Sequence, residues 1–298
     1  MSRNETPIPH ARAPRSVGFG LSRAAVYLAL ALVALLFLMP LVWMVSTSLK
    51  PEVQAASTNL RLLPEPASSV LDNAAANYRT VWNDPTITFP LYLRNTLIVA
   101  ILSVSGMTLS SAVVAYGLSR VSWRGRGAVF ATVLVSMMIP FPVLMIPLYM
   151  LFRELGWIGT LLPLWVPAWF GGAFNIFLLR QFFRGLPREL DEAARLDGCS
   201  HWRIFWQIVL PLSRPVLAVV ALFHFIYVWN DFLGPLIFVT RRENFTLALG
   251  LQLYQSKAGL TPWNLLMAAS TLVVLPLLAV FLLAQRTFVE GVAAEGVK

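Results

Sequence analysis

Long apolar segments separated by short polar ones make up most of this chain. Charged side chains are absent, or nearly so, from several windows longer than about 20 residues. About 20 apolar residues in a helix cross the roughly 30 Å hydrocarbon core of a bilayer. We therefore expect an all-α polytopic membrane protein with six transmembrane helices, at residues 24–45, 95–118, 128–151, 157–179, 215–239 and 264–285.

The overall composition agrees with this pattern. Hydrophobic residues make up 57% of the 298 positions and charged residues only 12%, and the mean hydropathy is +0.69. An ordinary soluble domain carries about 25% charged residues. The composition therefore argues against a soluble protein.

Lysine and arginine set the orientation, because cytoplasmic loops are enriched in them. With the N-terminus inside, 15 of the 23 Lys and Arg fall in cytoplasmic segments and 8 in external ones. We expect a disordered cytoplasmic segment at 1–23, one long external loop at 46–93, a core of five spans at 94–285, and a cytoplasmic tail at 286–298. Topology accounts for the net charge of +9, and the sequence has no clustered basic face that would indicate nucleic-acid binding.

The longest polar run in the second half of the chain predicts a short amphipathic helix at about 187–198. Pro187 suits a first helical position, and acidic residues crowd the first turns. Gly198 stands where a helix ends in a left-handed residue. Small and apolar side chains recur at helical spacing and predict one narrow packing face, formed by Leu186, Leu190, Ala193 or Ala194, and Asp197.

Several spans carry helix-breaking or small residues. The third contains Pro140, Pro142 and Pro147, and the fourth contains Pro163, Pro167, Gly171 and Gly172. Broken backbone inside a membrane needs protein or water as a partner, so these positions predict kinked helices around a cavity. In the second span a stripe of small residues predicts close helix packing or, alternatively, the lining of a permeation path: Ser103, Gly106, Ser110 and Gly117.

Asp231, which follows Trp229 and Asn230, is the charged residue within the fifth predicted span. A carboxylate at the bilayer centre costs about 2.5–3.5 kcal/mol on insertion scales, so it should face the helix bundle or water. One interpretation is a polar contact for substrate or gating; the other is a helix-pairing or snorkelling residue. His224, in the same span, is expected to be a hydrogen-bonded core residue.

Motifs for catalysis or metal binding are missing from the sequence. It contains no phosphate-binding loop, no H-E-x-x-H and no G-x-S-x-G. Its single cysteine, Cys199, excludes a disulfide within the chain, and the three histidines share no ligand spacing. We expect a non-enzymatic protein without a cofactor.

The polar run also carries a long motif with fixed spacing. Glu192-Ala193-Ala194, Gly198, Ile208 and Leu210-Pro211 resemble the EAA signature of ABC importer permease subunits at every defining position. Further segments are similar to the carbohydrate-uptake subgroup and its maltose-type second permease: Asn95–Leu97, Ala115–Arg120, Leu186–Gly198, Trp229–Phe232, Phe288–Gly291 and Leu49–Pro51. Cys199 replaces the small residue that usually follows the glycine.

This resemblance implies a type I ABC importer permease core with both termini in the cytoplasm, in a bacterial or archaeal cell membrane. It implies four kinds of partner: a second permease subunit, two ATPase subunits, an external solute-binding protein and a carbohydrate substrate, besides membrane lipid. The coupling residues that it indicates are Leu190, Glu192, Ala193, Ala194, Arg195, Asp197 and Gly198, and the candidate translocation residues are Trp229, Asn230 and Asp231.

Two other classes of protein are weighed against this one. A secondary transporter would work without an ATPase, but it predicts inverted repeats and usually several ionisable membrane residues, and the sequence shows neither. A structural or assembly protein would not need a cytoplasmic helix with a sharp end.

Overall fold

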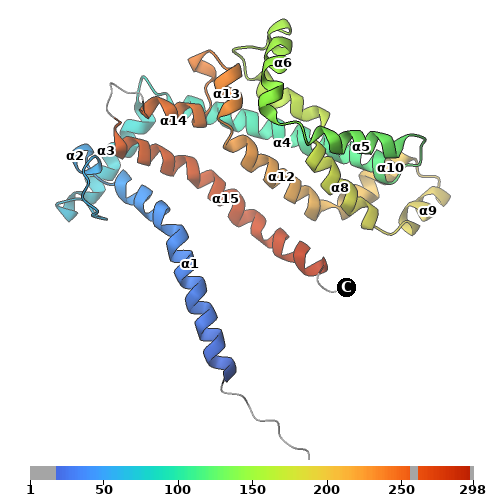
Figure 1. The fold of residues 1–298 in the computed structure, drawn as a ribbon, viewed down its shortest axis with the longest axis horizontal. Helices are drawn as coiled ribbons and strands as arrows, with labels where there is room; N and C mark the ends of the chain where they lie inside the picture. Colours follow the sequence, from blue (N-terminus) through green and yellow to red (C-terminus); the bar gives the residue numbers. More distant parts are fainter. Residues whose placement is uncertain (1–17, 256–260, 296–298) are drawn as a thin grey trace, which may run out of the picture.

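The computed structural model describes residues 18–255 and 261–295, and the regular elements in these ranges are all helical (Figure 1). Four helical segments are long and apolar enough to cross a membrane, and two bent helix pairs also qualify if each pair counts as one span. The expected all-α membrane protein with up to six spans is confirmed. The outermost parts of the expected terminal segments, at 1–17 and 296–298, lie outside the described residues. The side chains of the motif at 288–291 also lie outside the described part.

The four long segments are α1 (Gly18–Ser48), α4 (Phe89–Ser119), Leu162–Gly185 and α15 (Trp263–Glu295). α1 begins at Gly18, inside the stretch expected to be disordered. The helix thus starts several residues before the predicted span at 24–45. The described side chains of its first half, from Arg23 to Met39, are all exposed. α1 packs against α15 near the outer end and then diverges from the bundle (Figure 1).

The third expected span is not one straight helix. α5 (Arg126–Ser136) and α6 (Phe141–Glu154) are bent by 100° relative to each other. Pro140 lies in the break with extended backbone, at φ −70° and ψ 140°, and as a proline it offers no N–H to continue the helix. The predicted break is therefore confirmed at this position.

The fourth span is broken as well. A short helix α7 (Leu162–Trp165) runs into a 3₁₀ turn η2 (Val166–Phe170), and α8 (Ala173–Gly185) follows. Gly171 joins them with φ +85°, a conformation that side chains with a Cβ rarely adopt. Pro163 and Pro167 line the cavity described below, which confirms the prediction of kinked helices around a cavity.

The fifth expected span, 215–239, divides into α12 (Arg214–Trp229) and α13 (Leu233–Phe238). Asp231 lies in the break between them rather than inside a continuous helix. The chain also bends by 79° where the cytoplasmic segment His201–Leu212 meets α12. That segment comprises α10 (His201–Ile204), the π-helical turn η3 (Phe205–Val209) and α11 (Leu210–Leu212).

The external segments fold over the outer end of the bundle as α2 (Glu52–Ala55), η1 (Ala67–Ser69), α3 (Val70–Asn83), η4 (Arg242–Asn244) and α14 (Leu247–Gln255). Asn77 of α3 ties them to the long helices. Its amide donates to the carbonyls of Ser48 at 2.8 Å and Lys50 at 2.9 Å, and its oxygen accepts from Asn264 at 2.8 Å. Burial lowers the pKa of Lys50, whose ammonium lies 4.3 Å from the ring centre of Trp43.

Two apolar clusters hold the bundle together, one toward each side of the membrane. The outer cluster joins α3, α4, α12, α14 and α15 around Tyr92 and Trp229. The cytoplasmic cluster joins α4, α8, α12 and the segment after α9 (Glu189–Leu196) around Phe183 and Phe205. The candidate coupling helix, α9, packs against the second cluster through Ala194.

Candidate functional site

α9 is the cytoplasmic helix expected from the polar run, and it is shorter than predicted. It begins at Glu189, two residues after Pro187, and ends at Leu196. Leu186 is extended (φ −70°, ψ 141°), as expected for a residue that precedes proline. Gly198 has φ +78°, so the predicted left-handed exit is confirmed.

A buried ion pair fixes α9 to the bundle. The Arg120 guanidinium, at the end of α4, donates through Nε to Asp191 Oδ2 at 2.8 Å and through Nη2 to Asp191 Oδ1 at 3.0 Å. The two side chains are only 2% and 9% exposed. Such a two-pronged arginine–carboxylate pair constrains orientation as well as distance.

The same guanidinium also holds the chain that leads into α9. Arg120 Nη1 donates to the carbonyls of Phe183 at 3.2 Å and Leu186 at 2.8 Å, and Nη2 donates to that of Pro187 at 2.8 Å. One arginine side chain thus donates hydrogen bonds both to backbone carbonyls around the end of α8 and to the Asp191 carboxylate in the first turn of α9. Sequence reasoning did not pair Arg120 with Asp191, which lies 71 residues away; the Ala115–Arg120 motif contained the arginine but gave no indication of its partner.

The face of α9 that packs is narrower than the sequence suggested. Asp191 and Ala194 are buried, and Ala194 lies in the cytoplasmic cluster. Of the two alanines left open by the spacing, Ala194 therefore faces the bundle and Ala193 faces outward. The remaining candidate coupling residues are exposed: Leu190, Glu192, Ala193, Arg195, Asp197 and Gly198. Leu196, which sequence reasoning did not single out, is 90% exposed.

The chain after α9 is stiffened by aromatic rings. Trp202 stacks on Phe205 with ring centres 5.6 Å apart, and Trp206 lies edge-on to Phe205 at 5.3 Å. Phe205 is buried, whereas Trp202 and Trp206 are 58% and 44% exposed. Their turn is π-helical, and Pro211 just after it has no N–H to donate. Such turns are rare and often occur at functional sites.

A separate polar site lies in the membrane part of the bundle. A cavity of about 220 Å³ lies between α4, α6, α7, α12 and α13, and Asp231 lines it together with Ser103, His224, Tyr227 and Thr246. Asp231 Oδ1 accepts a hydrogen bond from the N–H of Gly234 at 3.0 Å, so the carboxylate caps α13. Thr246 Oγ1 is buried and has no hydrogen-bond partner among the described residues.

The neighbours of Asp231 do not share this cavity. Trp229 is 2% exposed and donates through Nε1 to the carbonyl of Val273 at 3.1 Å. Asn230 is exposed, and its amide donates to the carbonyl of Ile226 at 2.8 Å. His224 shares a 2.8 Å hydrogen bond with Ser103, as expected for a hydrogen-bonded core histidine.

The small residues of α4 mostly serve packing. A Cβ added to Gly106 would lie 2.4 Å from the Trp169 side chain, and Ser110 Oγ lies 3.1 Å from the carbonyl of Ala168. Gly117 differs, since a Cβ there would meet nothing within 4 Å. The packing interpretation of the stripe therefore fits Gly106 and Ser110, whereas Ser103 lines the membrane cavity.

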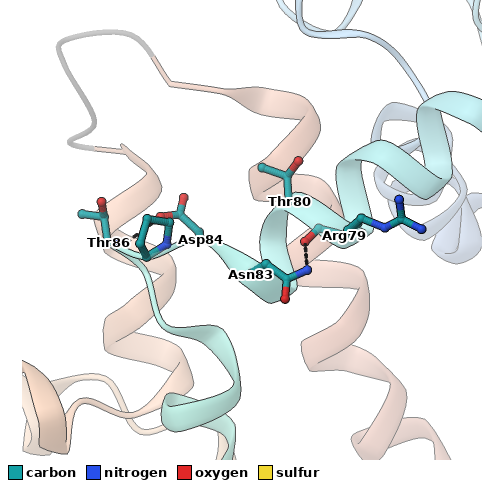
Figure 2. Close-up of a pocket in the computed structure, with 6 residues that line it drawn as sticks. Arg79, Thr80, Asn83, Asp84 and Thr86 are labelled. Carbon is teal, nitrogen blue, oxygen red and sulfur yellow. Dashed lines mark hydrogen bonds between the residues drawn. The ribbon is translucent and has the colours of Figure 1, made fainter.

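A second hollow lies on the external side, where α3 ends. It is open, has a volume of about 490 Å³ and is lined by Arg79, Thr80 and residues 83–86 (Figure 2). Asp84 Oδ1 accepts from the N–H groups of Thr86 at 2.8 Å and Ile87 at 3.1 Å. These hydrogen bonds fix the turn that forms one polar side of the hollow.

Among the described residues, no group of three or more His, Cys, Asp or Glu side chains is placed to hold a metal ion. Cys199 is a half-buried free thiol beside α9. The features with a specific geometry are thus the anchored cytoplasmic helix and the membrane cavity.

Comparison with known proteins gives the family context. Residues 108–293 match the family described as "binding-protein-dependent transport system inner membrane component". The chain is 32% identical over 284 residues to the arabinooligosaccharides transport system permease protein AraQ of Bacillus subtilis, covering 94% of this chain and 97% of that protein. It is 34% identical over 280 residues to the trehalose/maltose transport system permease protein MalG of Thermococcus litoralis, covering 93% and 98%.

A solved structure shares the fold. It is the crystal structure of a bacterial ABC transporter involved in the import of the acidic polysaccharide alginate. The TM-score is 0.77 with 23% sequence identity, and the alignment covers 92% of this chain and 99% of that one.

Proposed function

This chain belongs to the family of binding-protein-dependent transport system inner membrane components, and we propose that it carries a sugar across the membrane together with a second, related permease. It is a multi-pass, non-catalytic permease subunit of an ABC importer. A carbohydrate substrate is favoured because AraQ and MalG, which are similar over nearly their whole length, are named for sugar transport.

α9 is the proposed contact with an ATPase subunit. The observation that carries this proposal is the Arg120–Asp191 pair, which holds α9 rigidly while Glu192, Ala193 and Leu196 point away from the bundle. A short helix with a small residue such as Ala193 on its outer face can approach a partner closely. Glu192 can accept a charge-assisted hydrogen bond from a partner arginine.

The proposed assembly contains two ATPase subunits, a second permease and an external solute-binding protein. The exposed membrane face of α1 offers surface for lipid and for the second permease. The external loop at 46–93, with α3 and the hollow in Figure 2, is a candidate contact for the binding protein. The core of five spans at 94–285 would then move between inward- and outward-facing states, and ATPase closure acts only through its different affinity for the two.

Asp231 is the proposed polar contact of this chain on the translocation route. It lines the membrane cavity, and its carboxylate accepts a backbone hydrogen bond from Gly234 there, with no cationic partner among the described residues. Trp229 and Asn230 lie away from the cavity, so we propose that they position the break between α12 and α13 and do not contact substrate.

The test is ATPase co-purification combined with substrate-stimulated ATP hydrolysis in the reconstituted transporter. Glu192→Ala should insert and pair with the second permease but bind the ATPase more weakly, because it loses a charge-assisted bond of roughly 1.5–3 kcal/mol. Glu154→Ala is the matched control, since Glu154 is an exposed glutamate on the external side. Wild-type stimulation in Glu192→Ala would remove Glu192 from the proposed contact.

A further inference from the structure

Three arginines lie at the cytoplasmic ends of α5 and α8. Arg126 begins α5, and Arg180 and Arg184 lie one turn apart near the end of α8. α5 and α8 are in contact (Figure 1), and Phe130 of α5 stacks on Phe177 of α8 with ring centres 6.4 Å apart. Arg126 lies one turn before Phe130 and Arg184 lies one turn after Arg180, so this packing places the three arginines on adjacent ends of the two helices.

Arg180 is held at the centre of this cluster. Its guanidinium carbon lies 3.7 Å from the ring centre of Phe130, and its Nε donates to the carbonyl of Leu118 at 3.2 Å. Arg126 is itself fixed by a 3.0 Å bond from Nη1 to the carbonyl of Val121.

No carboxylate in the described part of the chain pairs with these three arginines. Arg120–Asp191 is the one cytoplasmic ion pair there, and both oxygens of Asp191 are already bound to Arg120. Three neighbouring arginines that lack an acidic partner among the described residues form a local positive potential. Planar guanidiniums bind phosphate oxygens in a two-pronged geometry.

The surroundings of the cluster are those of a membrane interface. Val129 and Val135 of α5 are 45% and 60% exposed, so an apolar surface runs from the arginines toward the bilayer centre. Trp123, 44% exposed, lies in the turn before α5 and donates through Nε1 to the carbonyl of Gly117 at 3.0 Å. Tryptophan at this level is typical of headgroup contact.

We propose that Arg126, Arg180 and Arg184 bind the phosphate group of an anionic phospholipid in the cytoplasmic leaflet, with an acyl chain along the exposed face of α5. A soluble phosphate shares the headgroup chemistry but has no acyl chain to contact that apolar face. Basic pockets between membrane helices on the cytoplasmic side are suited to such headgroups.

The experiment measures lipid retention. The full-length chain, purified with the subunits that accompany it, is exchanged into vesicles of phosphatidylglycerol or of phosphatidylcholine, and bound lipid is counted by native mass spectrometry. Arg126→Gln with Arg184→Gln should lower phosphatidylglycerol affinity roughly 30-fold, at about fivefold for each guanidinium near an anionic surface. Arg184→Gln alone should lower it about fivefold, and since Arg184 is exposed, this variant tests the proposal even if the double variant folds poorly.

Arg214→Gln is the matched control, because Arg214 is an exposed cytoplasmic arginine at the start of α12, outside the cluster. Its phosphatidylglycerol affinity should be unchanged, and phosphatidylcholine should bind the wild type and all variants alike. Unaltered phosphatidylglycerol binding in Arg184→Gln, or an equal loss in Arg214→Gln, would overturn the proposal. Displacement of phosphatidylglycerol by millimolar inorganic phosphate, or lipid binding only after the accompanying subunits are removed, would overturn it as well.

Discussion

Asp191 and Asp231 are both withdrawn from solvent, yet the chain binds their carboxylates in different ways. Asp191 receives two hydrogen bonds from Arg120, in a pair that is almost completely buried. Asp231 receives a backbone hydrogen bond from Gly234 and borders a cavity of about 220 Å³. The first carboxylate is buried together with its arginine, whereas the second has open space beside it.

This difference separates two kinds of functional residue. A carboxylate that is buried against an arginine can position a helix, but a passing solute cannot reach it. A carboxylate that caps a short helix at the edge of a cavity can exchange contacts with a ligand at small structural cost. The proposed coupling region should therefore respond to mutation through stability and subunit association, and the cavity region through transport kinetics.

The largest effect is expected from breaking the buried pair. Asp191→Ala leaves Arg120 as an uncompensated buried charge, which typically costs about 3–5 kcal/mol. α9 should detach, so that the permease unfolds at a lower temperature and loses the ATPase. Thermal unfolding in detergent and ATPase co-purification measure the two effects.

Glu189→Ala is the control for this prediction, since Glu189 is an exposed acid in the same first turn of α9. It should change the free energy of unfolding by no more than about 0.5 kcal/mol. Replacing both Arg120 and Asp191 by methionine should recover part of the stability, because removing a whole buried pair is often nearly neutral. Equal stability of Asp191→Ala and Glu189→Ala would show that the pair does not anchor the helix.

The next largest effect on stability is expected where α4 packs against Trp169. Gly106→Ala forces a Cβ within 2.4 Å of the Trp169 side chain, and overpacking of this kind costs about 1–3 kcal/mol. Gly117→Ala on the same helix meets nothing within 4 Å, so it should be neutral or stabilise α4 by up to about 1 kcal/mol. Thermal unfolding of the two variants compares them; a destabilisation of the same size in both would exclude the contact with Trp169 as the cause.

A smaller effect on stability is expected at Gly198, which follows α9, and its cause is the backbone conformation alone. Gly198 has φ +78° and open space around it, so Gly198→Val should cost about 1–2 kcal/mol through the left-handed conformation. Gly198→Asn should be tolerated better, since asparagine visits this region more readily. ATPase stimulation by the binding protein should fall in the valine variant and largely persist in the asparagine variant; the reverse order would contradict a backbone cause.

Asp231→Asn should have the smallest effect on stability. Asparagine keeps the oxygen that accepts from Gly234, so the free energy of unfolding should change by less than about 0.5 kcal/mol, whereas Asp231→Leu loses the cap and about 1 kcal/mol. If Asp231 contacts the solute, both variants change transport affinity or rate in a vesicle uptake assay. Normal uptake by a well-expressed Asp231→Leu protein would remove the residue from the route.

The sequence predicted those features that depend on local pattern. Hydrophobic windows located the membrane helices, Pro140 and Pro167 marked breaks, and Gly198 marked the end of α9, because each of these is set by a few neighbouring residues. The fifth span was misplaced beyond Trp229, because an apolar window does not show that the helix stops at Asn230.

Long-range pairing could not be predicted in the same way. Arg120 and Asp191 are far apart in sequence, and nothing in either segment specifies the other as its partner. The choice between Ala193 and Ala194 as the buried residue also depends on how α9 rotates against the bundle, which the ion pair fixes. For the same reason, the arginine cluster at Arg180 emerges only when α5 and α8 pack together.

The most direct test of the account is cross-linking from the outer face of α9. In a Cys199→Ala background, a cysteine at Ala193 should form a cross-link to the ATPase subunit in native membranes, and addition of ATP should change its yield. A cysteine at Arg214, exposed on the same side of the membrane, is the reference position and should form little or none. Efficient cross-linking from position 214 together with none from position 193 would contradict the assignment of α9 as the coupling helix.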